Sequence, residues 1–223
     1  MSSRNSDCIN ASPPVIVIGC GQSGLLAAIR LKQAGLPYTV IEKNPGVGGT
    51  WWENTYPGAR VDVGNHFYCY SFEPSDHWSE FFAQQPELQA YFQAVMERHG
   101  VTDHVRFDTE VTSAAWDESS GTWGVTVRTA DGDVETLQAR AVISAVGQLN
   151  QPYIPAIPGA ETFRGPAFHT ARWDHDVDLA GKNVVMIGAR HGCSPPRTIP
   201  PTSARACNGH CVTCRSTVAG TDS

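Results

Sequence analysis

The sequence of 223 residues lacks several features that would point to particular classes of protein. Its formal net charge is −6 and it contains no run of basic residues, so nothing in it favours nucleic-acid binding. No apolar stretch approaches the roughly 18 residues of a membrane-spanning helix. Residues 1–13 have no apolar core of a secretory signal, and we expect a short disordered lead there.

The final segment, residues 190–223, contains no Leu, Phe, Met, Trp, Tyr, Lys or Glu. Such a composition buries too little apolar surface to offset the entropy lost on ordering, so we expect an aberrant, disordered tail. Because an out-of-frame reading of a GC-rich gene would give this composition, our hypothesis is that the tail arises from a frameshift.

Cysteine usage excludes a secreted disulfide scaffold. The seven cysteines are an odd number and four of them crowd into the tail, so a reducing cytoplasm fits better. Cys207, Cys211 and Cys214 have the C-x₃-C-x₂-C spacing of radical S-adenosylmethionine enzymes, and Cys193 would complete a zinc set. Only nine residues follow Cys214, too few for the barrel that such a cluster needs, and we predict no metal site.

The pattern of apolar residues predicts an α/β protein. Val15–Ile18 is a β-branched run typical of a buried strand, "LLAAIRLKQAG" is a helix that Gly35 ends, and "YTVIE" is the next strand. Residues 15–42 are therefore a predicted βαβ unit, the beginning of a Rossmann-like parallel sheet.

Further elements follow along the chain. "PELQAYFQAVMERHG" is the clearest helix, with Pro86 in its first turn, Gly100 at its end and one apolar stripe. The segments "HVRFDTEV", "SAAWD", "WGVTVRT" and "VETLQA" are separated by turn signals and predict a small antiparallel meander. "AVISAVG" is expected to be another buried strand. The apolar stripe of the helix predicted in residues 86–100 consists of Leu88, Tyr91, Phe92, Val95 and Met96.

The turn after the first strand carries a dinucleotide-binding motif. In "VIVIGCGQSG", Gly19 permits a tight turn, Gly21 lets a diphosphate approach the backbone, and Gly24 lets helix and strand pack closely. The helix N-terminus favours phosphate binding, and Glu42 ends the second strand, where its carboxylate can accept hydrogen bonds from ribose hydroxyls. Cys20 and Cys69 do not form the redox pair that a pyridine nucleotide disulfide reductase needs, so that class is excluded.

The segments that follow resemble a known family. "EKNPGVGGTWWENTYPGARVDVGNHFYCYSF" is similar to flavoprotein monooxygenases of the Baeyer–Villiger and flavin-containing monooxygenase group. "FRGPAFHTARWD" fits their signature F-x-G-x-x-x-H-x-x-x-W-(P/D). The resemblance covers roughly residues 14–189, and "YPGARVDV" and "SAVGQLNQP" are most similar to the hydroxyacetophenone monooxygenase branch. The signature positions are Phe163, Gly165, His169, Trp173 and Asp174.

The resemblance implies roles for matching residues. Arg60 and Asp62 would lie near the isoalloxazine and the nicotinamide, and His169 with Trp173 would couple cofactor position to catalysis from a hinge. The catalytic candidates are therefore Asp62, Arg60 and His169, although Arg60 and Asp62 could also be a solvated surface pair. The cofactor-binding candidates are Gly19, Gly21, Ser23, Gly24, Glu42, Gly49, Thr50, Trp51, Asp62, Tyr68 and Val111.

The implied activity uses FAD and NADPH. One atom of O₂ is inserted into a ketone through a flavin peroxide, with a soft-heteroatom substrate as the alternative for the related nitrogen- and sulfur-oxygenating enzymes. A further alternative is a truncated, non-catalytic flavin-domain fragment. The sequence indicates neither a nucleic-acid nor a membrane partner, and it does not define an oligomeric state.

The expected organisation follows from these motifs. Residues 14–150 are the FAD-binding domain, 151–182 are a linker that carries the signature, and 183–189 ("NVVMIG" and its flank) begin a second Rossmann unit for NADPH. Arg190 stands where this second motif needs a glycine, and the pair Pro195–Pro196 opposes the helix that should follow. We therefore expect the NADPH site of this chain to be truncated.

Overall fold

The computed structural model describes residues 14–148, 151–187, 204–207 and 215–219 of the chain. These residues divide into two compact units, one from Met1–Trp52 with Gln89–Asn150 and one from Glu53–Leu88 with Gln151–Ser223. In this division residues 53–88 group with residues that follow position 150.

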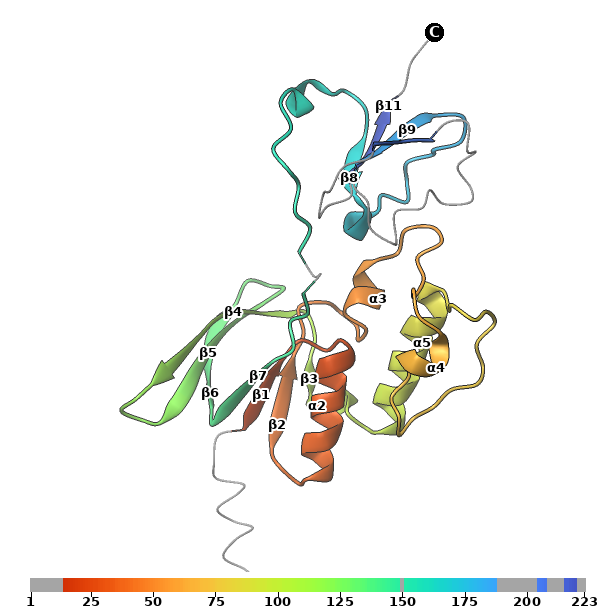
Figure 1. Cartoon of the computed structure of the whole chain (residues 1–223). Coiled ribbons are helices and arrows are strands. Elements are labelled where there is room, and N and C mark those ends of the chain that lie inside the picture. The colour runs from red at the N-terminus through yellow and green to blue at the C-terminus, as the bar shows by residue number, and fades with distance from the viewer. Residues whose placement is uncertain (1–13, 149–150, 188–203, 208–214, 220–223) are drawn as a thin grey trace, which may run out of the picture. The chain divides into compact units, whose positions relative to one another are not determined.

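The first unit contains a parallel sheet with the strand order β3-β2-β1-β7. Helix α2 (Gln22–Gln33) connects β1 (Val15–Ile18) to β2 (Tyr38–Ile41) and lies against the sheet (Figure 1). The other two strands are β3 (Val105–Arg106) and β7 (Ala141–Ser144). The predicted α/β fold with a βαβ unit is confirmed.

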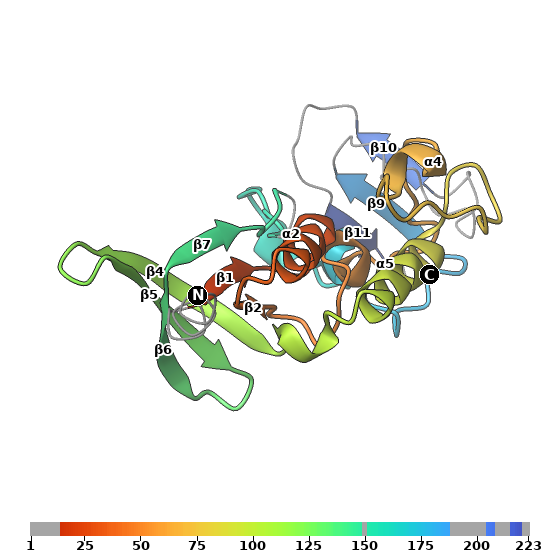
Figure 2. The same ribbon diagram turned by 90° about the horizontal axis from the view of Figure 1, so that it is seen from below.

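The predicted antiparallel meander is also present. Strands β4 (Thr109–Asp117), β5 (Thr122–Thr129) and β6 (Val134–Ala139) pair in this order, as Figure 2 shows from below. The meander shares an apolar core with β1 and β2, since alternate residues of the strands meet there. This core consists of Ile16, Ile41, Val125, Val127 and Ala139.

Two details of these strands differ from the sequence-based expectation. "HVRFDTEV" is not one strand, because Asp108 takes a positive φ of 50° and separates β3, which joins the parallel sheet, from β4. Strand β4 continues instead through "SAAWD", with an irregularity in its pairing between Val111 and Ser113. Strand β7 is half-buried rather than buried, since it lies at the edge of its sheet.

Helix α5 (Gln85–Arg98) has the predicted boundaries within a few residues. Pro86 lies in its first turn, and Gly100 follows its end with a φ of 59°. The predicted apolar stripe is buried along its whole length, which holds this helix in place. No helix among the described residues is long and apolar enough to cross a membrane.

The second unit contains a four-stranded sheet with the order β10-β9-β11-β8. The structure here differs from the prediction of a disordered tail, because two segments of residues 190–223 pair in strands with β9; the other tail residues lie outside the described residues. Its elements are α4 (Asn65–Tyr68), β8 (Ala167–His169), β9 (Asn183–Ile187), β10 (Ala204–Cys207), β11 (Arg215–Ala219), and the 3₁₀ helices Ala160–Thr162 and Thr170–Arg172.

Candidate functional site

The β1–α2 turn brings helix and strand into close contact through its glycines. A β-carbon on Gly24 would overlap the Gly19 carbonyl oxygen, so only glycine lets α2 begin this close to β1. Gly19 itself has a φ of 98°, and a β-carbon there would lie 2.7 Å from the Ala145 carbonyl oxygen. The turn therefore has the backbone geometry that the G-x-G-x-x-G motif predicts.

A second glycine-rich loop, residues 46–49, lies against this turn. The Gly48 N–H donates a hydrogen bond of 3.0 Å to the Cys20 carbonyl oxygen. A β-carbon on Gly49 would lie 2.9 Å from the Gly21 Cα, so the two backbones approach each other without intervening side chains. We call this pair of facing loops, residues 19–24 and 46–49, the glycine cradle.

The N-terminus of α2 opens onto the glycine cradle. Gly21 is its N-cap residue and provides no side-chain hydrogen bond, and the first turn contains no acidic residue. Ser23 is exposed in this turn. Because the helix dipole places partial positive charge at this end, the cradle favours an anionic group such as a phosphate.

Glu42 lies where the sequence predicts it, directly after β2. Its side chain is buried, and its carboxylate accepts hydrogen bonds from the Cys20 N–H at 2.6 Å and from the Asn44 N–H at 2.9 Å. Burial, together with the charge of Glu42, raises the pKa of the Cys20 thiol to about 12. The carboxylate is thus bonded to the first glycine loop of the cradle, close to the dinucleotide-binding turn.

Three further candidates, Val111, Thr50 and Trp51, belong to the first unit. Val111 lies near the start of β4 and packs against the core that the meander shares with the parallel sheet. Thr109, two residues earlier, donates its N–H to the Glu42 carbonyl oxygen at 3.0 Å. In helix α3 (Thr50–Glu53), Thr50 is exposed and Trp51 is buried, with the Trp51 N–H bonded to the Gly48 carbonyl oxygen at 3.1 Å.

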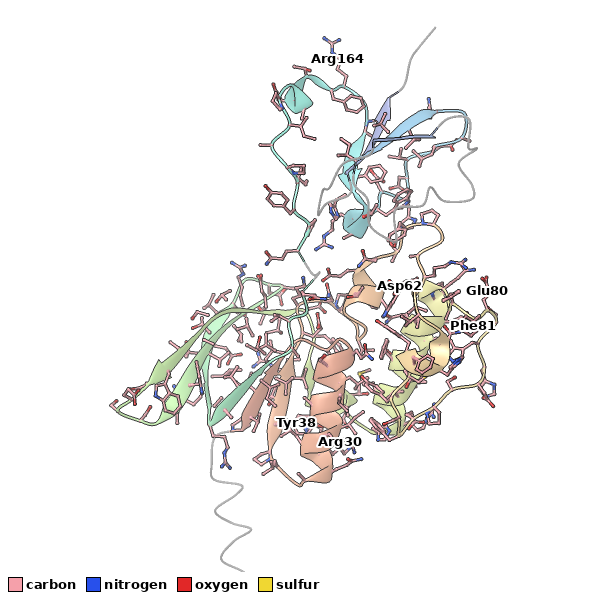
Figure 3. The ribbon with its side chains drawn as sticks, in the orientation of Figure 1. Arg30, Tyr38, Asp62, Glu80, Phe81 and Arg164 are labelled. Carbon is pink, nitrogen blue, oxygen red and sulfur yellow. The ribbon has the colours of Figure 1, made fainter. Side chains whose placement is uncertain are left out.

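Arg60 and Asp62 lie in the second unit and do not pair with each other. The Arg60 guanidinium forms an ion pair of 2.8 Å with Glu80, while Asp62 is exposed and has no hydrogen-bond or ion-pair partner among the described residues (Figure 3). Tyr68, at the end of α4, is half-buried. The Asp62 carboxylate is therefore held by its backbone rather than by a charged neighbour.

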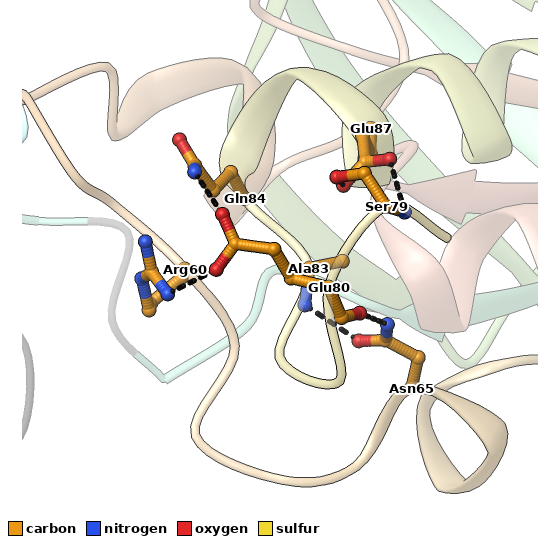
Figure 4. Close-up of polar contacts among 7 residues, drawn as sticks. All are labelled: Arg60, Asn65, Ser79, Glu80, Ala83, Gln84 and Glu87. Atoms are coloured by element: carbon orange, nitrogen blue, oxygen red, sulfur yellow. Dashed lines mark hydrogen bonds and ion pairs between the residues drawn. The ribbon is translucent and has the colours of Figure 1, made fainter.

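The segment that carries Asp62 is fixed by a side-chain clamp (Figure 4). Asn65 is 2% exposed, and its amide donates to the Glu80 carbonyl oxygen and accepts from the Ala83 N–H, both at 2.6 Å. Backbone hydrogen bonds from Val61 to the Ala83 carbonyl and from Asn65 to the Phe81 carbonyl support the same pairing. Glu80 and Asn65 were missed from the sequence, because nothing local relates residues 60–65 to residues 80–83.

The signature residues all lie in the second unit. His169 Nδ1 accepts a hydrogen bond of 3.1 Å from the Ala171 N–H and so caps the 3₁₀ helix that follows. Burial, with a smaller contribution from Arg172, lowers the pKa of His169. The Trp173 ring packs edge-on against Phe168 with centroids 5.2 Å apart. The remaining signature positions are Phe163 and Gly165, both half-buried, and Asp174, whose carboxylate accepts from the Asp176 N–H at 3.0 Å.

The signature also contacts residues that directly follow the glycine-rich segment in sequence. Arg172 forms a 3.4 Å ion pair with Glu53, and His175 shares a 2.9 Å hydrogen bond with Thr55. Within the described residues no group of three or more His, Cys, Asp or Glu side chains is arranged to hold a metal ion. Cys193, Cys211 and Cys214 lie outside those residues, as does the departure from the second glycine motif at Arg190.

Comparison with known proteins identifies the family. Residues 13–196 match the family model described as Flavin-binding monooxygenase-like, so the chain belongs to this family. It is 45% identical over 188 residues to a Baeyer-Villiger monooxygenase of Streptomyces coelicolor. The matched region covers 83% of this chain and 35% of that protein. The resemblance seen in the sequence is confirmed.

Solved structures give the same result for the fold. The crystal structure of an OTEMO complex with FAD and NADP matches with a TM-score of 0.73 and 37% identity over 80% of this chain and 35% of that one. An ε-caprolactone-bound cyclohexanone monooxygenase matches with a TM-score of 0.75 and 34% identity, covering 86% of this chain and 38% of that one. The chain thus spans about a third of the length of these relatives.

Proposed function

We propose that this chain carries the FAD-binding region of a Baeyer–Villiger-type monooxygenase, which uses NADPH and O₂ to oxygenate a small ketone. The observation that carries the proposal is the glycine cradle, two facing glycine loops at the N-terminus of α2 with the Glu42 carboxylate bonded beside them. The named relatives support the ketone as substrate rather than a soft heteroatom.

The residues present fit the diphosphate and ribose of FAD. The diphosphate would lie against the glycine cradle at the N-terminus of α2, where Gly21 and Gly49 have no side chains, and would accept hydrogen bonds from the first turn of α2 that includes Ser23. Glu42 would accept hydrogen bonds from the adenosine ribose through its remaining lone pairs. FAD, when bound, supplies the redox chemistry that links NADPH to O₂.

The isoalloxazine end would be held by the segment after the cradle. Thr50 and Trp51 in α3, together with Tyr68 and Val111, are the residues that we assign to it from the family resemblance. Arg60 and Asp62 would provide charge near the isoalloxazine and the nicotinamide. The exposed, unpaired carboxylate of Asp62 supports this assignment, since a charge without an internal partner is available to a ligand.

The hinge role is assigned to His169 and Trp173. Because Nδ1 of His169 accepts the Ala171 N–H, the neutral ring carries its proton on Nε2, which leaves an N–H donor for cofactor or protein. We further propose a reducing compartment, supported by the free thiols of Cys20 and Cys69.

A flavin-binding experiment tests the proposal. The purified 223-residue chain is titrated with FAD, and binding is followed by quenching of flavin fluorescence and by the visible spectrum after desalting. We expect a stoichiometric yellow complex, with NAD⁺ at equal concentration unable to displace FAD. Folded chain, verified by circular dichroism, that retains no flavin would refute the proposal.

A second step addresses the reaction. NADPH is added to the FAD complex without oxygen, and loss of the flavin absorbance reports reduction. Bleaching followed by reoxidation in air, with conversion of cyclohexanone to its lactone, would support the complete activity. A yellow complex that NADPH does not bleach would restrict the function to cofactor binding and favour the non-catalytic alternative.

A further inference from the structure

We propose that Gln89 is a positioning residue that holds the second loop of the glycine cradle in the geometry required by the FAD diphosphate. This inference rests on the proposed function. Gln89 lies in α5, 40 residues after the loop in sequence, and no motif points to it.

The Gln89 side chain contacts the loop at two successive residues. Its Nε2 donates a hydrogen bond of 2.5 Å to the Val47 carbonyl oxygen. Its Oε1 lies 2.1 Å from the position that a β-carbon on Gly48 would take, so the amide uses the room that this glycine leaves. Gly48 in turn donates its N–H to Cys20, in the first loop of the cradle. The path from α5 to the first loop therefore runs through two hydrogen bonds.

The orientation of the amide is set by the loop. Because the Val47 carbonyl is an acceptor, the NH₂ group must face it, and turning the amide over would bring two oxygens together. Oε1 is then buried and has no hydrogen-bond partner among the described residues. An unsatisfied buried acceptor is unfavourable, so an apolar side chain of similar size would suit this place better if it only filled space. The glutamine is explained by what its NH₂ group does.

The surroundings of Gln89 support this reading. Its neighbours on the buried side of α5 are the apolar residues Leu88 and Phe92, both fully buried. Gln93, one turn further along the helix, donates instead to Glu97 at 2.7 Å on the exposed surface. Gln89 and Gln93, two of the three glutamines of α5, thus make different contacts, and Gln93 provides a matched control.

The consequence for binding follows from the close approach of the two loops. The close contact between Gly49 and Gly21 depends on where the second loop lies, and a diphosphate bound to the cradle needs several donors at hydrogen-bond distance at once. Releasing Val47 lets the loop move away from Gly21. The bound state then loses donors, whereas the core beneath the loop keeps its packing.

The test compares Gln89→Met, which keeps the length of the side chain and removes the hydrogen bond, with Gln93→Met in the same chain. We expect Gln89→Met to weaken FAD binding about fivefold to tenfold, as for the loss of one hydrogen bond with some loosening of its neighbours. Gln93→Met should bind FAD as the unsubstituted chain does. Both variants should have similar melting temperatures without FAD.

Hydrogen–deuterium exchange without FAD gives an independent readout. Gln89→Met should speed exchange at Gly48, Trp51 and Trp52, whose N–H groups are bonded within the cradle and α3, and should leave the amides of α2 unchanged. If exchange in this segment does not change, the inference is wrong, whether or not the chain binds FAD. If the unsubstituted chain binds no FAD but exchange does change, the proposed function fails and the role of Gln89 in holding the loop stands.

Discussion

Gly21→Ala should separate cofactor binding from folding. The residue has an extended backbone (φ −78°, ψ −166°) that alanine also adopts, and its β-carbon would lie 3.5 Å from the Gly49 Cα, an ordinary contact. We therefore expect the free energy of unfolding to change by no more than about 1 kcal/mol, because alanine reduces the entropy of the unfolded chain but is a poorer N-cap residue than glycine.

The same methyl group would lie 3.5 Å from the Gly49 Cα, within the glycine cradle where we propose that the diphosphate binds. A phosphate oxygen must come within about 2.9 Å of a backbone N–H, and a methyl group there would displace it. Losing two hydrogen bonds to a charged phosphate, at about 1.5–3 kcal/mol each, should weaken FAD binding about 10²- to 10⁴-fold.

The assay is an FAD titration together with a urea melt of the protein without FAD. Gly124→Ala in β5 is the matched control, since its β-carbon would lie 3.6 Å from the nearest atom, a methyl carbon of Thr136; it should leave FAD affinity unchanged and raise stability by at most about 1 kcal/mol. Unchanged affinity in Gly21→Ala, at unchanged stability, would show that the diphosphate does not bind in the cradle.

Three further predictions concern Cys20, His169 and Asn65. Because burial and Glu42 raise the pKa of Cys20 to about 12, iodoacetamide at pH 8.5 should not label Cys20 until urea unfolds the chain; labelling of the native protein, seen by peptide mass spectrometry, would contradict this. Burial and Arg172 lower the pKa of His169 from 6.5, so its stabilising effect is complete above pH 6.5 and is lost as the pH falls. His169→Asn, which keeps an acceptor for the Ala171 N–H, should flatten the fall in stability between pH 7.5 and pH 5, and an equal fall in urea melts would refute this. Asn65→Ala removes the partner of the buried Ala83 N–H and that of the Glu80 carbonyl and should cost about 2–4 kcal/mol, with faster proteolysis within residues 79–87; a melt like that of the unsubstituted chain would disprove the clamp.

The elements that the sequence predicts well are those with a strong local pattern. The βαβ unit at residues 15–42 and the buried stripe of α5 both follow from apolar periodicity, which depends on neighbours in the chain. The boundary between β3 and β4 was not predictable in this way, since Asp108 adopts a positive φ where its N–H reaches the Asn44 carbonyl oxygen at 3.2 Å. A contact across 64 residues of sequence leaves no periodic signal.

The residues of the candidate site also differ in whether a local sequence pattern predicts them. Gly19, Gly24 and Glu42 are found from spacing alone, because the turn, the helix and the next strand are adjacent in sequence. Asn65 and Gln89 are not, because each acts by hydrogen bonds from a side chain to a distant backbone segment. Their signal is a side-chain amide bonded to backbone groups far away in the sequence, which only the folded structure displays.

The glycines of the two loops can be sorted by what a side chain would meet. A β-carbon on Gly24 would overlap the backbone. In the second loop, a β-carbon on Gly46 would overlap the Trp52 ring and one on Gly48 would overlap the Gln89 amide. Gly19 and Gly49 have positive φ values. Each of these is a glycine because the protein itself leaves no room or requires the conformation. Gly21 has neither constraint within the described residues, so packing does not account for it. We attribute this glycine to the proposed ligand, which would approach the backbone there, so Gly21→Ala is the substitution in the cradle that we expect to change FAD binding more than folding.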